Sequence, residues 1–393
     1  MSDHPVVIAG AGVAGLSAAL ALAKAGQPSL VLERAPHLSE FGAGLQLGPN
    51  ATRRLKGWSA LEPLQRQGLA PEAVDVFVGE SGEKIVDLPL ADAQARWGAP
   101  YLLAHRADLL SALAEAVYRH PLITVRLGCE VEGWTETGEG VRVRAAAGPE
   151  LAACALIGAD GVRSRVRAGM RLFDVDKPIY TGRTSWRALV PAHAAHAAFL
   201  RPRGGLRLSP GAHLVHYPLR QASVVNVVAI VEDEWLEPDM VDFWSASGDV
   251  DYLASRFALW SAEVRALIDA APEWRRWPLY TRRRAPRWRR GRVALLGDAA
   301  HAMAPFLAQG AAQAIEDADA LGQAFADHPQ NVIAALRAYE SARVLRANRV
   351  QALSGRQGRI YHLDGPLARA RNLSMRAMGS SGMARAVDWL YRA

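Results

Sequence analysis

The first 33 residues switch between two hydrophobic patterns. Residues 5–9 form a short apolar run, residues 16–25 are rich in alanine and leucine, and residues 29–33 begin with a second apolar run. Short apolar runs on either side of a helical stretch are typical of buried parallel strands joined by a crossover helix. The pattern therefore predicts a strand–helix–strand unit, which indicates an α/β domain.

The pattern changes after residue 73. Residues 74–78 and 85–88 are strand-like, and the polar residues 79–83 between them suit a five-residue loop, which predicts a β-hairpin. Apolar residues at helical spacing return over residues 106–119. The β-rich segment therefore interrupts the α/β pattern.

The remaining pattern mixes strands and helices. The predicted strands are 125–127 and 141–143 on either side of a turn at 137–140, a β-rich stretch at about 180–232, and 292–296; the predicted helices are 240–271 and most of the chain after 296. Because the β-rich pieces alternate with α/β segments, we expect domains that are discontinuous in sequence.

Composition is that of a soluble globular protein, with 50% hydrophobic and 22% charged residues among 393. The apolar stretch at residues 13–25 is too short to span a bilayer, and no basic segment precedes it, so we expect neither a membrane span nor a secretory signal. Cys129 and Cys154 stand apart from any histidine cluster and are expected to be buried thiols in a reducing compartment, which suggests the cytoplasm. No metal site is predicted.

The net charge of +7 comes from arginines that are mostly scattered. The densest group lies between Arg282 and Arg292 and is interpreted either as a solvated basic face or as a field that attracts anionic cofactors and aromatic acids. Because no basic run or helix face stands out, nucleic-acid binding is not expected.

A glycine fingerprint occupies the turn after the first strand. Gly10 permits a tight turn, Gly12 allows close approach of a pyrophosphate, and Gly15 allows helix and strand to pack closely. Glu33, at the end of the second strand, stands where an acidic residue binds an adenosine ribose. Ala14 and Arg34 are assigned to the same site. By itself this motif fits NAD and FAD equally well.

Four further motifs distinguish the two cofactors. They are Gly297-Asp298-Ala299-Ala300-His301 with its continuation to 318, Ala159-Asp160-Gly161-Val162-Arg163-Ser164, His105-Arg106-Ala107-Asp108-Leu109, and Phe41-Gly42-Ala43-Gly44 with its continuation to 51. In this order and spacing they resemble the flavin-dependent aromatic hydroxylases, the family of para-hydroxybenzoate and salicylate hydroxylases, over essentially the whole chain. The resemblance implies non-covalently bound FAD.

The resemblance also implies site residues. Asp298 would accept hydrogen bonds from the ribityl chain, or alternatively act as a helix N-cap. Gly310 would begin a helix whose N-terminus faces the flavin pyrimidine, and Arg106 would reach the FAD phosphates. His301 is interpreted as structural. The other cofactor residues implied are Gly44, Gln46, Asp160, Gly297, Pro305 and Ala311, although Asp160-Gly161 is equally a common turn dipeptide.

His213 and Tyr217 are the predicted catalytic residues. They stand four positions apart on a predicted strand and so share one face, whereas His216 points to the other. The surrounding segment resembles the part of salicylate and hydroxybenzoate hydroxylases that lines the substrate pocket. A histidine there would act as the base that ionises the substrate phenol, and Tyr217 would orient the phenol or carboxylate. The alternatives are a core histidine and aromatic packing.

Together these features predict a doubly wound FAD-binding domain (1–73, 100–175 and 278–393) that includes a C-terminal helical tail, with an inserted β-sheet substrate domain (74–99 and 176–277). The tail is expected to dock on the FAD domain or on a partner in a homodimer. The resemblance implies that NADH or NADPH binds transiently and reduces FAD. The reduced flavin would then react with O2 to form a flavin hydroperoxide, which would hydroxylate a phenolic or hydroxypyridine carboxylic acid.

Three alternatives stay open at this point. An NAD-dependent dehydrogenase would use the glycine fingerprint alone. A related flavin epoxidase or antibiotic-modifying monooxygenase would bind FAD without needing His213. A non-catalytic FAD-binding regulatory protein would bind the cofactor without turnover.

Overall fold

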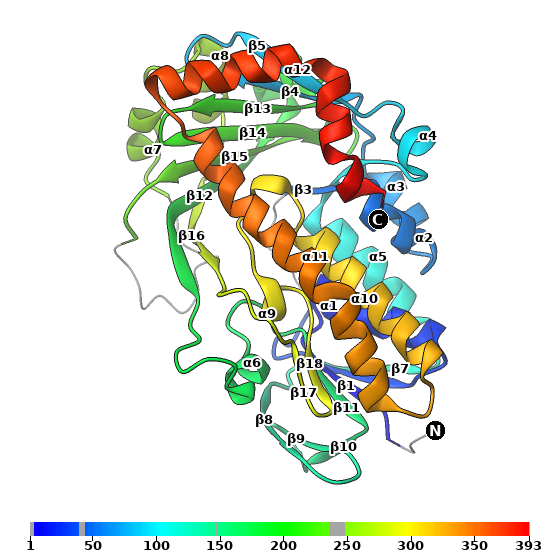
Figure 1. Cartoon of the computed structure of the whole chain (residues 1–393). Helices are drawn as coiled ribbons and strands as arrows, with labels where there is room; N and C mark the ends of the chain where they lie inside the picture. Colours follow the sequence, from blue (N-terminus) through cyan, green and yellow to red (C-terminus); the bar gives the residue numbers. More distant parts are fainter. Residues whose placement is uncertain (1–3, 39–43, 147, 236–247, 393) are drawn as a thin grey trace.

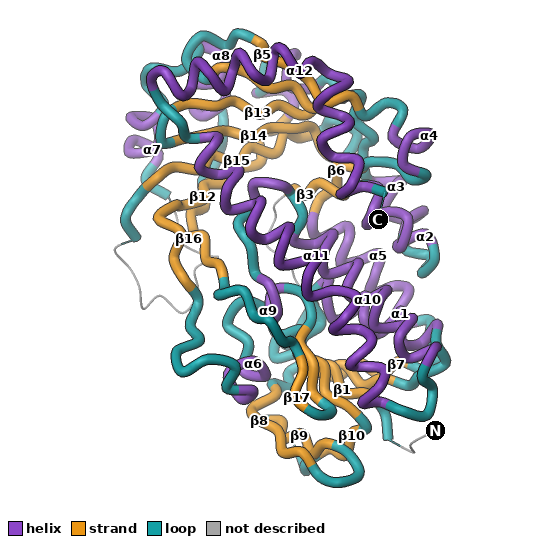
Figure 2. Tube along the Cα trace, in the orientation of Figure 1, coloured by secondary structure: helices purple, strands orange, loops and turns teal. Residues whose placement is uncertain are grey.

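The chain folds around two large β-sheets that are bridged by long C-terminal helices (Figures 1 and 2). The computed structural model describes residues 4–38, 44–146, 148–235 and 248–392. Strand β1 lies in the lower sheet of Figure 1, and the end of α12 lies near α2 and α3.

The first sheet is the core of the dinucleotide-binding fold. Its order is β17-β18-β11-β1-β2-β7, and all neighbouring strands run parallel except β17 with β18. Strands β1, β2 and β11 are buried along their whole length, which explains their unbroken apolar sequences. The strands are β1 (Val6–Ala9), β2 (Ser29–Leu32), β7 (Ile123–Arg126), β11 (Ala155–Gly158), β17 (Arg289–Arg290) and β18 (Val293–Leu295).

Helices pack on this sheet and on one another. Helix α1 packs against both α5 and α10, and a small sheet of order β10-β9-β8 contacts β11. The elements are α1 (Val13–Lys24), α5 (Arg106–Tyr118), α6 (Arg165–Met170), α9 (Asp298–His301), α10 (Gly310–Asp327), β8 (Val131–Glu136), β9 (Val141–Ala145) and β10 (Leu151–Ala153).

The second sheet has seven strands in the order β16-β12-β15-β14-β13-β4-β5. One of its faces forms an apolar core with helices α7 and α8, and the other faces the dinucleotide-binding fold. The elements are β4 (Ala73–Val78), β5 (Lys84–Pro89), β12 (Ile179–Pro191), β13 (Arg203–Ser209), β14 (Ala212–Leu219), β15 (Val224–Glu232), β16 (Arg275–Thr281), α7 (Val250–Arg256) and α8 (Ala262–Asp269).

Short elements fill the space between the sheets. Strands β3 and β6 pair as a small antiparallel ribbon, and α2 packs against α10. The elements are β3 (Gly44–Leu47), β6 (Leu102–His105), α2 (Pro49–Lys56), α3 (Leu61–Gln67), α4 (Ala93–Trp97) and the 3-10 turn η4 (Pro305–Leu307). Two other 3-10 turns, η1 (Ala192–Ala194) and η2 (Ala197–Leu200), belong to the opposite side of the second sheet, where Phe199 joins the core with α7 and α8.

The C-terminal tail contacts the elements around both sheets of its own chain. Helix α11 (Val332–Tyr361) runs between them, and α12 (Gly365–Tyr391) packs along β5 before it kinks at Gly379, whose φ is +61°. Beyond the kink, the Trp97 indole donates to Asp388 at 2.7 Å. The tail therefore docks on its own chain, on α4 as well as on the second sheet.

The fold class is confirmed, including the hairpin β4–β5 and the helix α5. One strand assignment was wrong: residues 125–127 do not flank the turn at 137–140, because β7 pairs with β2 and the turn joins β8 to β9. A bulge between Val131 and Gly133 interrupts the alternation of β8 and hid it from the pattern. Of the helix predicted at 240–271, α7 and α8 are observed, and residues 240–247 lie outside the described residues.

The domain boundaries stay a prediction. The seven-stranded sheet extends from Ala73 to Thr281, close to the predicted limits of the inserted segment. Both cysteines are buried and free.

Candidate functional site

The turn after β1 is tight everywhere except at Gly12. Gly10 has φ +100°, and a methyl group there would lie 2.6 Å from the carbonyl oxygen of Ala159. A methyl group at Gly15 would lie 1.8 Å from the carbonyl oxygen of Gly10. A methyl group at Gly12 would meet no atom of another residue within 4 Å, and no side chain caps the N-terminus of α1, which follows Gly12. This is the geometry that a pyrophosphate needs.

Glu33 is held beside this turn. Its carboxylate accepts hydrogen bonds from the backbone N–H of Ala11 at 2.7 Å and of Ala35 at 2.9 Å. The bonds fix the acidic group at the end of β2, next to the glycine turn, where an adenosine ribose would bind. The adjacent Arg34 is exposed. Contacts of either residue with the cofactor stay predictions.

Replacing Gly12 by alanine is expected to weaken FAD binding about 10- to 100-fold, because an added methyl group in a filled site costs about 1–3 kcal/mol. The apoprotein should keep its thermal midpoint, since the space is open in the protein itself. Gly355→Ala in α11, also in open space, serves as the control. Titration with FAD measures both; unchanged affinity in Gly12→Ala would remove Gly12 from the cofactor site.

The second glycine turn joins the N-termini of α1 and α10. Gly297 has φ +62°, and a methyl group there would lie 2.9 Å from the Cβ of Ala14 and 3.3 Å from that of Ala314. Gly310 begins α10 without a side-chain cap and faces open space. Two uncapped helix N-termini therefore lie on either side of Gly297, as binding of an anionic cofactor requires.

Asp298 and Asp160 have different surroundings. Asp298 is exposed and is the first residue of α9, so the N-cap alternative is wrong because Gly297 holds that position. Asp160 accepts from the Ser164 hydroxyl at 2.5 Å and from the N–H groups of Arg165 and Val166 at 2.7 and 3.1 Å. Asp160 thus stabilises the start of α6, and its contact with FAD stays a prediction.

The arginine cluster is only partly a solvated face. Arg283, Arg284 and Arg287 are exposed, but Arg282 is buried and donates to the carbonyl oxygens of Val162 and Asp176, each at 2.6 Å. It therefore anchors the segment that follows Asp160-Gly161.

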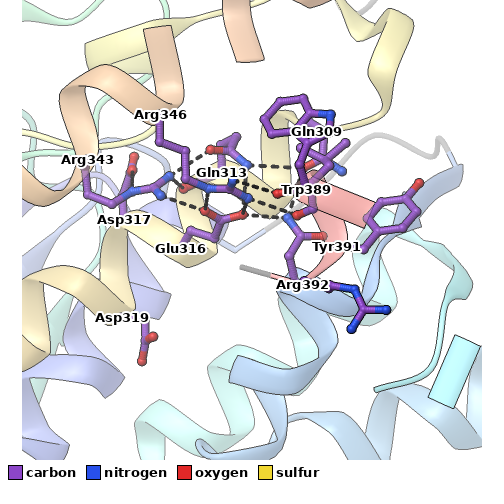
Figure 3. Close-up of polar contacts among 12 residues, drawn as sticks. Gln309, Gln313, Glu316, Asp317, Asp319, Arg343, Arg346, Trp389, Tyr391 and Arg392 are labelled. Atoms are coloured by element: carbon purple, nitrogen blue, oxygen red, sulfur yellow. Dashed lines mark hydrogen bonds and ion pairs between the residues drawn. The ribbon is translucent and has the colours of Figure 1, made fainter. Parts of the chain in front are cut away.

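A buried network that the sequence did not reveal supports the α10 motif (Figure 3). Glu316 accepts hydrogen bonds from Asn50 at 2.6 Å and from Gln313 at 2.9 Å. Arg343 and Arg346 each form an ion pair with it at 2.6 Å. Burial alone would raise the pKa of Glu316, but the hydrogen bond from Arg346 and the charges of both arginines hold it below its usual value.

The neighbouring carboxylate binds the second glycine turn. Asp317 accepts from the N–H of Gly297 at 3.0 Å, from Arg343 at 2.7 Å and contacts His301 Nε2 at 2.5 Å. All of His301 is buried, with its ring centroid 5.1 Å from that of Trp288. The contacts support the structural interpretation of His301.

The loop predicted to lie against the flavin reaches the second sheet. The N–H of Gly44 donates to the Asn226 side chain at 2.7 Å, and a methyl group on Gly44 would lie 2.6 Å from a ring carbon of Tyr217. Gln46 accepts a hydrogen bond from the Tyr101 hydroxyl at 2.7 Å. Phe41-Gly42-Ala43 lie outside the described residues. Gly44 thus needs to be glycine because Tyr217 packs against it.

His213 and Tyr217 lie on the sheet face toward the dinucleotide-binding fold. The register pairs His213 with Ile230 and Tyr217 with Asn226. The ring centroid of His213 lies 5.4 Å from that of Phe306, which directly follows Pro305. His216 is on the opposite face against Phe199, where burial lowers its pKa to about 3.

The buried surroundings of both residues fix their charge. Burial, followed by the nearby His362 and Arg183, holds the pKa of His213 well below its usual value. Burial raises the pKa of Tyr217 above its usual value. At neutral pH the site therefore presents a neutral imidazole and a neutral phenol.

Arg187 is a residue of this face that the sequence analysis missed. It pairs across β12–β15 with Val228, which pairs with Val215 between His213 and Tyr217. Its guanidinium lies 4.6 Å from the Trp277 ring centroid, and burial lowers its pKa to about 10. The alternation of β12 could have indicated an arginine on the inward face. Arg106, half-buried at the start of α5, is close enough to Arg187 to contribute to that lowering.

The described residues show neither a metal-binding cluster nor a membrane-spanning helix. They contain no group of three or more His, Cys, Asp or Glu side chains that could hold a metal ion. Among the described helices, none combines the length and apolar character needed to cross a membrane.

Comparison with known proteins agrees with this geometry. The family described as FAD binding domain matches residues 3–196 and 247–354. The chain is 35% identical to 3-hydroxybenzoate 6-hydroxylase 1 of Aquipseudomonas alcaligenes, over 98% of this chain and 97% of that one. It is 35% identical to 6-hydroxynicotinate 3-monooxygenase of Bordetella bronchiseptica, over 89% and 90%. A salicylate hydroxylase substrate complex superposes with a TM-score of 0.85 and 25% identity, covering 100% and 96% of the two chains.

Proposed function

The chain belongs to the FAD binding domain family and is an FAD-dependent aromatic monooxygenase, and we propose that it hydroxylates a small phenolic or hydroxypyridine carboxylic acid. NADH or NADPH and O2 are the co-substrates. The observation that carries this proposal is the shared sheet face that presents His213, Tyr217 and Arg187 beside Gly44.

The residues around the two glycine turns fit FAD. The pyrophosphate would lie at Gly12, the adenosine ribose at Glu33, and the ribityl chain and flavin at Asp298 and the N-terminus of α10. The reduced cofactor supplies the activated oxygen that is added to the aromatic ring. Side chains of the protein would bind and orient the substrate and remove its proton.

His213 would remove the proton of the substrate hydroxyl. An ionised hydroxyl pushes electron density into the ring and makes its carbon a better nucleophile, and a neutral histidine can accept that proton. Tyr217 stays a neutral phenol because burial raises its pKa. It can therefore donate a hydrogen bond that orients the resulting phenolate.

Arg187 would bind the substrate carboxylate. An arginine with a lowered pKa beside Trp277 is a desolvated cation, and the guanidinium fork matches a carboxylate. The two relatives described above are named for acids that carry a ring hydroxyl, a carboxylate and an aromatic ring. The proposed substrate class follows because the same site holds a base for the hydroxyl, His213, and a cation for the carboxylate, Arg187.

The decisive experiment measures NADH and NADPH oxidation by the FAD-loaded protein with a panel of hydroxybenzoates, salicylate and hydroxynicotinates, together with product analysis. We expect one acid to accelerate oxidation strongly and to be recovered with one added oxygen. Hydrogen peroxide without product would identify a bound mimic. No acceleration by any acid would contradict the proposed substrate class and favour the epoxidase-like alternative.

Replacing Arg187 by methionine is expected to raise the KM for the aromatic acid about 10- to 100-fold, since a hydrogen bond to a charged group contributes about 1.5–3 kcal/mol. Binding of the matching phenol without a carboxylate should hardly change. KM and Kd values for both compounds test this. Equal weakening of acid and phenol would mean that Arg187 only packs against Trp277.

A further inference from the structure

A chain of hydrogen-bonding side chains leads from the buried His213 to the protein surface. His213 Nδ1 lies 2.7 Å from His362 Nε2, and His362 Nδ1 lies 3.0 Å from Glu232 Oε1. His213 and the His362 side chain are 1% and 2% exposed, whereas the Glu232 side chain is 46% exposed. The three residues come from β14, the end of α11 and the end of β15, far apart in sequence.

Two neighbours of this chain, Glu232 and Arg183, influence where its protons lie. The Arg183 guanidinium is 2.7 Å from Glu232, and it and His362 hold the pKa of Glu232 below its usual value against the opposing effect of burial. In the tautomer that suits a relay, His362 donates from Nδ1 to this ionised carboxylate at 3.0 Å and accepts at Nε2, whereas the Arg183 Nε, 3.3 Å from the same Nδ1, donates to it in the other tautomer. His213 then donates from Nδ1 and keeps a lone pair on Nε2. That tautomer is the one a general base requires.

A proton that His213 accepts from the substrate must be passed on to another group. A charged imidazole is costly at a buried site, and the pKa of His213 is held well below its usual value by burial, by His362 and by Arg183. The charged or titratable groups that face the two histidines are Arg183 from β12, Glu232 from β15, Tyr361 from α11 and Arg371 from α12. Of these, Glu232 is the group that connects to solvent, because its ionised carboxylate can receive a proton in passing and release it to water.

We propose that His362 is a proton-relay residue that connects the catalytic base His213 to Glu232 and solvent. As the phenolic O–H bond breaks, His213 gains the proton at Nε2 and passes its Nδ1 proton to His362 Nε2. His362 then passes its own Nδ1 proton to Glu232, which releases it to water. The reverse transfer restores the starting tautomers when the product phenolate is protonated for release. This inference rests on the proposed function.

The test follows phenolate formation on the FAD-loaded enzyme, with 3-hydroxy-4-nitrobenzoate as the probe because its phenolate absorbs visible light. After rapid mixing at about pH 5.5, His362→Gln is expected to form phenolate about 10- to 100-fold more slowly than wild type, less than the loss of a whole acid–base group because His213 itself is kept. Glutamine keeps a hydrogen bond to His213 but cannot gain a proton on one side while it loses one on the other. The deficit should vanish at about pH 8.5, where the probe arrives already ionised.

Two variants separate a relay from a packing role. Glu232→Gln should slow phenolate formation less than His362→Gln, because water reaches the outer end of the chain. Tyr361→Phe should match wild type, since its ring lies 5.2 Å from His213 but its hydroxyl bonds to the carbonyl oxygen of Phe306.

Three outcomes would overturn the relay. They are a wild-type rate in His362→Gln, a deficit that is equal at both pH values, and binding of the probe to the wild type without phenolate. The last outcome would also remove the proposed function, whereas the first two would leave it intact. Binding itself is followed by the change in flavin absorbance.

Discussion

Replacing Arg343 by methionine is expected to lower the free energy of unfolding by about 3–5 kcal/mol and to weaken FAD binding. Arg343 is paired with both Glu316 and Asp317, so its loss leaves two buried carboxylates with fewer partners. Because Asp317 holds the N–H of Gly297, the second glycine turn should loosen as well. Urea unfolding and FAD titration measure the two effects.

A surface pair provides the control for this variant. Arg119→Met, at the end of α5, removes an ion pair to Glu115 in which the two side chains are 74% and 45% exposed, and should cost no more than about 1 kcal/mol. The cost of Arg343→Met should also shrink as the pH falls from 7 toward 5. Without Arg343, burial raises the pKa of the two carboxyl groups, so the variant is relieved by taking up protons at a pH where wild type stays ionised. A loss of less than about 1 kcal/mol in the free energy of unfolding would show that the ion pair between Glu316 and Arg346 is enough to stabilise the network without Arg343.

Replacing His213 by glutamine is expected to slow hydroxylation about 10²–10⁴-fold, the usual contribution of a general base. NADH oxidation stimulated by the aromatic acid should persist in part and yield hydrogen peroxide in place of product. The rate of product formation at saturating substrate tests this at neutral pH and at high pH. Above the pKa of the free phenol the deficit should narrow, because ionised substrate no longer needs a base.

His196→Gln, in the exposed part of the same domain before η2, is the matched control and should keep full activity. FAD content and thermal midpoint should be unchanged in both variants. If His213→Gln hydroxylates at the wild-type rate, base catalysis by this residue is wrong. Turnover without His213 is instead the behaviour expected of an epoxidase-like enzyme.

The sequence predicted features that depend on neighbours in the chain. The glycine turn at 10–15, the strand–helix–strand unit and the hairpin after residue 73 each have a local signature, and each is present. The shared face of His213 and Tyr217 follows from the two-residue period of a strand. These features needed no knowledge of distant contacts.

The parts that were missed depend on contacts between distant segments. In the sequence, Glu316 was only part of a motif, because its partners Arg343 and Arg346 lie on another helix and come close to it only in the folded chain. Arg187 is one of many arginines, and only the register of β12 places it beside Val228. His362 lies in the tail, whose docking the sequence left open.

The position of Arg343, Arg346 and Trp389 in the chain has a consequence for biosynthesis. Arg346 donates to the carbonyl oxygen of Trp389, 43 residues further along the chain, and the first sheet cannot be completed before β18 is made and pairs with β11. At a translation rate of about 5–20 residues per second, the segment after β18 takes about 5–20 s to emerge. The network around Glu316 and Asp317 is therefore completed only late in synthesis, and a chain that ends before Arg343 lacks the ion pairs that hold both carboxylates.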